Sequence, residues 1–253
     1  MILLVDIGNA RIKWALQDAD TWMVGEPLLR LHRAFKDIAR PAWKELDAPE
    51  RIVVSNVAGE DYRKSVQTWI RRRWKVTPEF LPVTERQCGV SNAYSVPQRL
   101  GADRWASLLA VHAYYKGPAV VIDCGTAITI DAISADGTHL GGLIVPGMEL
   151  MVNALTVHAP GIQIEDTDRQ DISLLGRSTE AAVSGGVLYT AIALVERVFM
   201  DLKGELGART NLLLTGGDAT RILPLLGSRP EYVPDLVLKG LAVYAEEAAE
   251  CVT

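Results

Sequence analysis

Hydrophobic residues occur in this chain as short continuous runs that end at aspartate, glycine or proline. The first run, from Met1 to Val5, is closed by Asp6. A continuous apolar run of this length, bounded by a turn-forming residue, is typical of a strand that is buried on both faces. We therefore predict that the fold begins with a buried strand.

The same pattern occurs a second time in the middle of the chain. Residues 2–9 read Ile-Leu-Leu-Val-Asp-Ile-Gly-Asn, and residues 119–126 read Ala-Val-Val-Ile-Asp-Cys-Gly-Thr. An alternating segment follows each copy, over residues 10–16 and 127–133. Because a strand, a tight turn and a returning strand form a hairpin, the repeat predicts two equivalent hairpins. It favours an internal duplication over two unrelated turns.

The rest of the pattern alternates between strands and helices. Ser178 or Thr179 and Asp235 are suitable N-caps for the last two long helices. Hairpins followed by strand–helix alternation predict mixed sheets flanked by helices. We expect two similar α/β lobes, residues 1–112 and 113–253. The predicted strands are 51–55, 75–81, 139–145 and 211–215, and the predicted helices are 61–73, 104–115, one from about 148, 178–202 and 235–250.

The composition is that of a soluble globular protein, with 49% hydrophobic and 23% charged residues. A formal net charge of −5 provides no basic field for nucleic acid or an anionic membrane. No uninterrupted apolar run reaches the roughly 20 residues that span a bilayer. Cys88, Cys124 and Cys251 are far apart and lack metal-ligand spacing. Together these features predict a cytoplasmic protein without a disulfide framework or a zinc site.

The two Asp-x-Gly turns carry the groups that a nucleotide phosphate site needs. Lys13 can reach phosphates as a point charge, Thr129 adds a polar contact, and Asp6 is a candidate for holding Mg²⁺ through water. The chain contains neither a Walker A loop nor a G-x-G-x-x-G loop. The simplest ATP-binding arrangement is therefore an actin-like (ribonuclease H-like) fold with the ATP cleft between the lobes. Candidate phosphate donors are the backbone N–H groups of Gly8, Asn9, Gly125 and Thr126.

A third motif, Gly101-Ala-Asp-Arg104, precedes an apolar helical stretch. Asp103, beside an arginine, can serve as a general base or an orienting group for a substrate hydroxyl. Equally, an aspartate in the first turn of a helix is favoured by the helix dipole without any catalytic role. The spacing alone does not distinguish these two interpretations.

Taken in order, these motifs resemble those of the type III pantothenate kinases, the family that includes proteins of the Bvg accessory factor type. The resemblance covers nearly the whole chain. The Gly-Ala-Asp-Arg motif at 101–104 and the later Asp-x-Gly-Thr-Ala motif at 123–127 are together specific to the family. A single Asp-x-Gly turn, in contrast, is shared with many sugar kinases and chaperones. The motifs are Asp6-Ile-Gly-Asn9, Gly101-Ala-Asp-Arg104, Asp123-Cys-Gly-Thr-Ala127 with Thr129 and Asp131, Gly142-Leu-Ile-Val-Pro-Gly147, and Thr215-Gly-Gly217.

The resemblance implies ATP-dependent phosphorylation of pantothenate to 4′-phosphopantothenate, the first step of coenzyme A biosynthesis. It implies Mg²⁺ with ATP, a monovalent cation (potassium or ammonium) at Asp123, and Asp103 as the catalytic base. The implied ATP-binding residues are Asp6, Ile7, Gly8, Asn9, Ala10, Arg11, Ile12, Lys13 and Thr126. The implied pantothenate-binding residues are Tyr94, Gly101, Ala102, Asp103, Arg104 and Thr179.

The resemblance also implies a homodimer, in which the partner subunit closes the pantothenate pocket and Thr179 acts across the interface. No nucleic-acid or membrane partner is expected. One position departs from the family, because Ala10 stands where a hydroxyl residue is usual, and one phosphate contact is expected to be lost. Two alternatives stay open: an actin-like kinase for another small hydroxy acid or sugar, and a non-catalytic regulatory protein on the same scaffold.

Overall fold

The computed structural model describes residues 1–18, 21–30, 33–162, 164 and 175–250 of the chain. The chain divides into two compact units. Unit 1 comprises residues 1–116, the short segment 135–140 and the C-terminal segment from Asp235. Unit 2 comprises residues 117–134 and 141–234. Cys251 lies outside the described residues, and Cys88 and Cys124 are free thiols.

Unit 1 is built on a mixed sheet in which the strands follow the order β3-β2-β1-β5-β6, with β4 paired to β2. A separate two-stranded hairpin, β7-β8, belongs to the same unit. The strands are β1 (Ile2–Ile7), β2 (Arg11–Asp18), β3 (Thr21–Val24), β4 (Leu28–Leu29), β5 (Arg51–Asn56), β6 (Glu79–Phe80), β7 (Arg86–Gln87) and β8 (Val90–Ser91). The helices are α1 (Phe35–Ala42), α2 (Glu60–Trp74), the 3-10 turn η1 (Pro97–Arg99), α3 (Ala102–Tyr114) and α7 (Leu236–Glu250).

Unit 2 is built on a sheet with the order β11-β10-β9-β12-β13. Ser178 caps its longest helix, and its hydroxyl accepts a hydrogen bond from the N–H of Ala181, as predicted. The strands are β9 (Ala119–Cys124), β10 (Ala127–Ile133), β11 (His139–Pro146), β12 (Asn211–Thr215) and β13 (Glu231–Tyr232). The helices are α4 (Met148–His158), α5 (Thr179–Leu206), α6 (Ala219–Ile222) and the 3-10 turn η2 (Leu223–Leu225).

The two sheets share one topology, as the sequence repeat predicted. In unit 1, β1 is antiparallel to β2 and parallel to β5, and β5 is parallel to β6. In unit 2, β9 is antiparallel to β10 and parallel to β12, and β12 is parallel to β13. Both Asp-x-Gly segments therefore join the central strand of a sheet to its antiparallel neighbour. The α/β fold with mixed sheets and flanking helices is confirmed.

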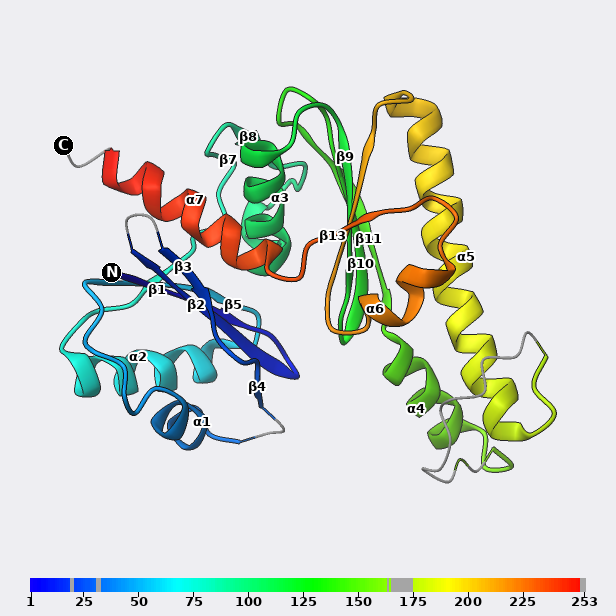
Figure 1. Ribbon diagram of the computed structural model, residues 1–253, viewed down its shortest axis with the longest axis horizontal. Coiled ribbons are helices and arrows are strands. Elements are labelled where there is room, and N and C mark those ends of the chain that lie inside the picture. Colours follow the sequence, from blue (N-terminus) through cyan, green and yellow to red (C-terminus); the bar gives the residue numbers. More distant parts are fainter. Residues whose placement is uncertain (19–20, 31–32, 163, 165–174, 251–253) are drawn as a thin grey trace. The chain divides into compact units, whose positions relative to one another are not determined.

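The first sheet is covered on both faces (Figure 1). Leu3, Val5 and Ile7 of β1 pack with α1 and α2 in one hydrophobic cluster. Trp43, Trp69 and Trp74 join the same cluster through edge and tilted ring contacts. Alternate residues of a strand point to opposite faces, so Leu4 and Asp6 face the side on which α3 and α7 lie. Asp6 is thus a polar residue among apolar neighbours on the face of the sheet that carries α3.

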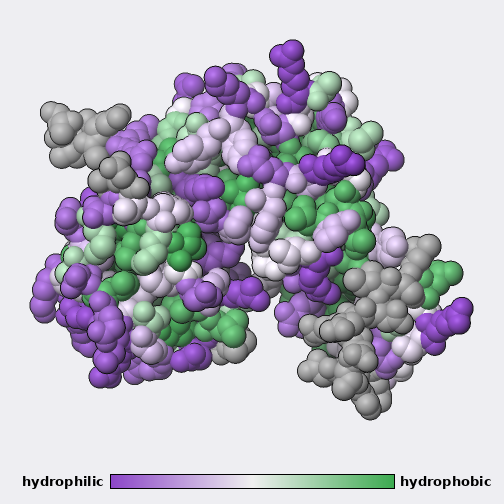
Figure 2. Space-filling view, viewed as in Figure 1, coloured by the Kyte–Doolittle hydropathy of each residue, from purple (hydrophilic) through white to green (hydrophobic). Residues whose placement is uncertain are grey.

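Unit 2 is organised in the same way around β9 and α5. Val120, Ile122 and Cys124 pack with Val187, Ala191 and other α5 residues in one hydrophobic cluster. The alternate residue Asp123 therefore faces the opposite side of this sheet. In one view, hydrophobic side chains also reach the surface of unit 2 over the region where α5 and α6 lie (Figure 2).

Helix α5 is the one described helix that is long and apolar enough to cross a bilayer, judged by length and composition alone. The stretch from Ala181 to Val195 carries no charged residue, and Glu196 and Arg197 then interrupt it. Its buried residues recur at helical spacing and pack in the core of unit 2. Core packing accounts for the buried apolar face of α5.

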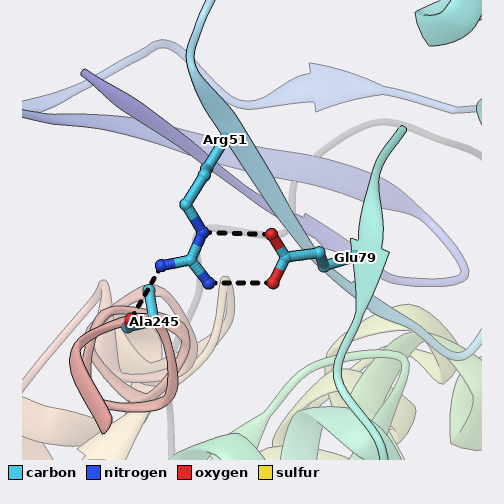
Figure 3. Close-up of polar contacts among 3 residues, drawn as sticks. All are labelled: Arg51, Glu79 and Ala245. Carbon is cyan, nitrogen blue, oxygen red and sulfur yellow. Dashed lines mark hydrogen bonds and ion pairs between the residues drawn. The ribbon is translucent and has the colours of Figure 1, made fainter. Parts of the chain in front are cut away.

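The two compact units divide the chain differently from the expected lobes 1–112 and 113–253, because unit 1 also contains residues 113–116, 135–140 and the segment from Asp235. Helix α7 was expected in the second lobe, but it packs on α3 and on strands β1 and β5 of unit 1. Arg51 of β5 helps to hold it there (Figure 3). Its guanidinium forms a bidentate ion pair with Glu79 (Nε–Oε1 3.0 Å, Nη2–Oε2 2.8 Å) and donates from Nη1 to the Ala245 carbonyl oxygen at 2.8 Å.

Some predicted elements are shorter than expected, and others were not predicted. The strand expected over 75–81 contains only β6, because Lys75 ends α2 in a left-handed conformation with φ 62°. Helix α1 was missed because it is short and contains Pro41. Its Phe35 and Ile38 are held by the aromatic cluster of unit 1 rather than by local helix signals.

Replacing Gly240 with alanine should destabilise the protein. A Cβ at this position of α7 would lie 1.8 Å from the carbonyl oxygen of Ala106 in α3, so the two helices would have to separate. Overpacking of this kind costs about 1–3 kcal/mol in the free energy of unfolding. The matched control is Gly204→Ala in α5, where a Cβ meets nothing within 4 Å. Denaturant unfolding that gave both variants wild-type stability would contradict the close α3–α7 contact.

Candidate active site

Asp6 lies one residue before the end of the central strand of unit 1. Its partners in the ladder are Lys13 on β2 and Ser55 on β5. Residues directly opposite in a sheet point to the same face, so these three side chains form one row. Asp6 is buried, with 8% of its surface exposed, and Ser55 is fully buried. The row places a carboxylate, an ammonium group and a hydroxyl on the face that carries α3.

The turn after Asp6 uses its backbone groups differently from the expectation. The Gly8 N–H donates to the Arg11 carbonyl oxygen at 3.0 Å and closes the hairpin. The Gly8 N–H, which was predicted to bind phosphate, is therefore already bound within the hairpin. In the part of the chain that the structure describes, no acceptor is paired with the N–H of Asn9. Asn9 and Ala10 are exposed at the tip of the turn.

Asp123 occupies the equivalent place in unit 2. Its ladder partners are Thr129 on β10 and Thr215 on β12, which place two hydroxyl groups beside the carboxylate. The Gly125 N–H donates to the Ala127 carbonyl oxygen at 3.1 Å, so it too closes its hairpin. Within the described residues the N–H of Thr126 is paired with no acceptor. The sequence repeat thus extends to the hydrogen bonds of both turns.

Two further glycine turns pack directly on the second Asp-x-Gly turn. The Gly147 N–H donates to the Thr126 carbonyl oxygen at 2.9 Å, and a Cβ on Gly147 would lie 2.2 Å from the carbonyl oxygen of Gly125. Gly216 has a φ of +100°, and a Cβ there would lie 2.4 Å from the Cys124 carbonyl oxygen and 2.5 Å from Oδ1 of Asp123. Glycine is required at both positions, because a side chain would collide with the backbone of the Asp123 turn. The last two motifs of the sequence therefore surround the Asp123 turn.

Cys124 lies inside this group of turns and is fully buried. Burial, together with the negative charges of Asp123 and Asp218, raises the pKa of its thiol to about 12. The thiol is therefore protonated at neutral pH. Cys124 acts as a packing residue in the core of unit 2.

Asp103 lies in the first turn of α3, at the carboxyl end of the first sheet. Its Oδ1 accepts a hydrogen bond from the N–H of Arg104 at 2.7 Å. A Cβ on Gly101 would lie 3.8 Å from Cγ1 of Val57, and the Val57 N–H donates to the Ile7 carbonyl oxygen at 3.1 Å. The start of α3 is thus next to the ends of β1 and β5, where the Asp6 turn begins.

A hydrogen bond with Arg104 holds the predicted substrate residue Tyr94 against α3. Arg104 is buried, and its Nη1 lies 2.9 Å from the Tyr94 hydroxyl. Tyr94 stacks on His139 with 6.1 Å between ring centroids. Two residues outside the predicted site, Asn92 and His139, shape the loop that carries Tyr94. The Asn92 side chain accepts the Tyr94 N–H at 2.9 Å, and His139 Nδ1 accepts the Ala93 N–H at 3.4 Å.

The remaining predicted residues are distributed over both units. Asp6 to Lys13, Tyr94 and Gly101 to Arg104 belong to unit 1. Asp123, Thr126 and Thr179 belong to unit 2, and Thr179 is exposed as the first residue of α5. Asn92 carries a detectable sequence signal, since asparagine often caps the backbone two residues ahead. His139 and its stacking on Tyr94 depend on residues far apart in the sequence and left no such signal.

Oxygen atoms dominate the possible cation ligands of both turns. Among the described residues, no group of three or more His, Cys, Asp or Glu side chains is placed to hold a metal ion. The Asp123 row offers one carboxylate and two hydroxyl groups, and the Asp6 row offers one carboxylate and one hydroxyl group. Carboxylate, hydroxyl and carbonyl oxygens suit hard cations such as Mg²⁺ and K⁺.

Solved structures with the same fold define the class. The chain aligns with a Baf family protein from Campylobacter jejuni at a TM-score of 0.58 and 22% identity, covering 98% of this chain and 99% of the other. It aligns with a glucokinase from an Antarctic psychrotroph at a TM-score of 0.51 and 13% identity, covering 97% and 98%. The chain therefore shares the α/β fold of these two proteins, and this bears out the actin-like fold that the sequence predicted.

Sequence comparison identifies the family. A family model described as type III pantothenate kinase matches residues 2–201. A type III pantothenate kinase from Nitrosococcus oceani is 44% identical over 255 residues, covering 99% of this chain and 96% of the relative. Another from Nitrosospira multiformis is 35% identical and covers 99% and 93%. The chain belongs to the type III pantothenate kinase family, as its motifs predicted.

Native Cys124 should resist alkylation at pH 8. With a pKa raised to about 12, its thiolate fraction lies roughly a thousandfold below that of an ordinary cysteine, and the surrounding turns block access. Peptide-level mass spectrometry after iodoacetamide treatment measures labelling at this residue alone. The control is the same protein in denaturant, where Cys124 should label readily. Rapid labelling of the folded protein would contradict the packing of the three glycine turns.

Proposed function

We propose that this protein transfers the γ-phosphoryl group of ATP to the primary hydroxyl of pantothenate, giving 4′-phosphopantothenate and ADP. In the cell this would be the first step of coenzyme A biosynthesis. The observation that supports the proposal most is the position of Asp103. A carboxylate in the first turn of α3 lies next to the ends of β1 and β5, where the Asp6 turn begins.

In this proposal residues 6–13 and Thr126 bind ATP. The N–H groups of Asn9 and Thr126 are the backbone donors for phosphate oxygens, since those of Gly8 and Gly125 close their hairpins. Lys13 supplies positive charge beside Asp6 in the ladder. Because residue 10 is alanine, the turn offers no side-chain hydroxyl there. Phosphate binding at this turn therefore relies on main-chain geometry.

Two cations complete the proposed nucleotide site. Asp6 would hold Mg²⁺ through water, and the Asp123 carboxylate with its neighbouring threonine hydroxyls would hold a monovalent cation, potassium or ammonium. When bound, these ions neutralise phosphate charge during transfer. The contribution of the chain is to fix oxygen ligands at the end of each central strand.

The acceptor alcohol is assigned to Asp103 and its neighbours. With Oδ1 held by the Arg104 N–H, the carboxylate has a defined orientation at the helix start. Asp103 would align the pantothenate hydroxyl and take its proton as the new oxygen–phosphorus bond forms. Gly101, Ala102, Arg104 and Tyr94 would contact the rest of the substrate. The buried Arg104–Tyr94 pair offers a cation and a hydroxyl for its polar groups.

We also propose a cytoplasmic homodimer in which Thr179 reaches the pantothenate site of the partner subunit. Unit 2 supports this proposal because apolar side chains stand exposed on the edge strand β11 and on α5. Leu143 and Ile144 of β11 are 46% and 62% exposed, and Tyr189 of α5 is 41% exposed. Free thiols and a net charge of −5 fit a reducing, aqueous compartment.

The proposal predicts ATP consumption that depends on both pantothenate and the monovalent cation. A coupled assay for ADP should give turnover with pantothenate in potassium or ammonium buffer, and about tenfold or more lower turnover in sodium buffer. A panel of sugars and other hydroxy acids serves as the control set. Turnover with one of these acceptors, and none with pantothenate, would overturn the substrate assignment. No turnover with any acceptor would favour a regulatory protein.

Asp103→Asn should fold normally and lose most of its turnover. The asparagine side chain still offers an oxygen to the Arg104 N–H, so the helix start is retained, but it cannot accept the proton from the alcohol. We expect kcat to fall about 100-fold or more, as for loss of a general base. Thermal unfolding with and without ATP checks the fold and nucleotide binding. A kcat near that of the wild type would refute the assignment.

A further inference from the structure

The carbonyl oxygens of the first Asp-x-Gly turn are bound by one residue that lies about twenty positions later. Arg30 donates from Nη1 to the carbonyl oxygens of Asn9 at 3.1 Å and Gly8 at 3.4 Å. Its backbone N–H donates to the Ala10 carbonyl oxygen at 2.8 Å. Three consecutive carbonyl groups are therefore held on one side by a single residue.

Strand pairing explains why Arg30 reaches this turn. The short strand β4 pairs with β2 so that Leu29 lies opposite Arg11 and Leu28 opposite Ile12. Arg30 follows Leu29 along the chain, and Ala10 precedes Arg11, so the antiparallel register places Arg30 opposite Ala10. The ladder thus brings the arginine to the tip of the hairpin.

An aromatic ring fixes the guanidinium. The Cζ atom of Arg30 lies 4.3 Å from the centroid of Tyr62 in α2. Tyr62 in turn packs edge-on against Phe35, with 6.0 Å between ring centroids, and joins the aromatic cluster of unit 1. A cation stacked on a ring anchored in this way loses little further freedom when it binds the turn.

We propose that Arg30 is a positioning residue for ATP, and this rests on the proposed function of residues 6–13. In a trans peptide the carbonyl and the N–H point in opposite directions. Where the carbonyl oxygen accepts a hydrogen bond from Arg30, the N–H of the same peptide therefore points away from the guanidinium. The planes after Gly8 and Asn9 carry the N–H groups of Asn9 and Ala10. Arg30 therefore aims the donors of the exposed tip and adds positive charge behind them. This main-chain control replaces the hydroxyl that Ala10 lacks.

The test is Arg30→Gln, assayed in the full-length protein. The substitution keeps the backbone N–H that binds Ala10 and removes the guanidinium from Gly8 and Asn9. We expect the KM for ATP to rise about tenfold, in the range for loss of a charged hydrogen bond. The KM for pantothenate and the kcat at saturating ATP should stay within about twofold. The stabilisation of the protein by ATP in a thermal shift assay should fall in parallel.

Matched variants separate positioning from fold and from general charge. Arg33→Gln removes a nearby cation whose Nη2 donates to the Asp37 carbonyl oxygen, and it should leave the KM for ATP unchanged. Tyr62→Phe keeps the ring and should resemble wild type, whereas Tyr62→Leu removes it and should raise the KM for ATP part of the way. An unchanged KM for ATP in Arg30→Gln would overturn the inference, as would an equal effect of Arg33→Gln. If the wild-type protein itself neither binds nor consumes ATP, the proposed function fails first.

Discussion

Each sheet of this protein holds one aspartate at the end of its central strand, between two polar ladder partners, and the candidate site depends on this arrangement. Asp6 lies between Lys13 and Ser55, and Asp123 between Thr129 and Thr215. Asp6 is buried and Asp123 is partly buried, and a carboxylate removed from water requires polar neighbours. Because side chains alternate along a strand, a slip of one residue would turn each aspartate into a hydrophobic cluster. The register of both hairpins is therefore fixed by the core and by the carboxylate together.

The packing of α3 fixes the position of Asp103, the residue proposed to align the acceptor alcohol. The start of α3 lies next to the ends of β1 and β5, and its later turns lie against α7. Gly240 allows the two helices to touch at Ala106, and Arg51 ties α7 to β5 and β6. The C-terminal helix thus supports the helix that carries Asp103. This explains why the last segment of the chain belongs to the same compact unit as the first.

The positions of the candidate site's motifs in the fold were largely predictable, because these motifs are local. The two hairpins and the glycine turns at 147 and 216 lie where the sequence placed them, and α3 begins at Ala102, two residues before the expected start at 104. The donors within each turn were only partly predicted. The N–H groups of Gly8 and Gly125 were expected to face phosphate, but each closes its own hairpin because the returning strand brings a carbonyl oxygen within 3.0 Å and 3.1 Å. Sequence alone gives the turn residues but not the partner of each backbone group.

The sequence by itself determined the duplicated α/β pattern, the family and the positions of the carboxylates, since runs of apolar residues and fixed turn motifs act over short distances. Only the tertiary structure decided which distant residues complete them. Arg30 reaches the first turn through the β4–β2 ladder, His139 stacks on Tyr94, and α7 joins unit 1. These contacts join residues far apart in the chain. They form because burying apolar faces brings the segments together, which no local pattern records.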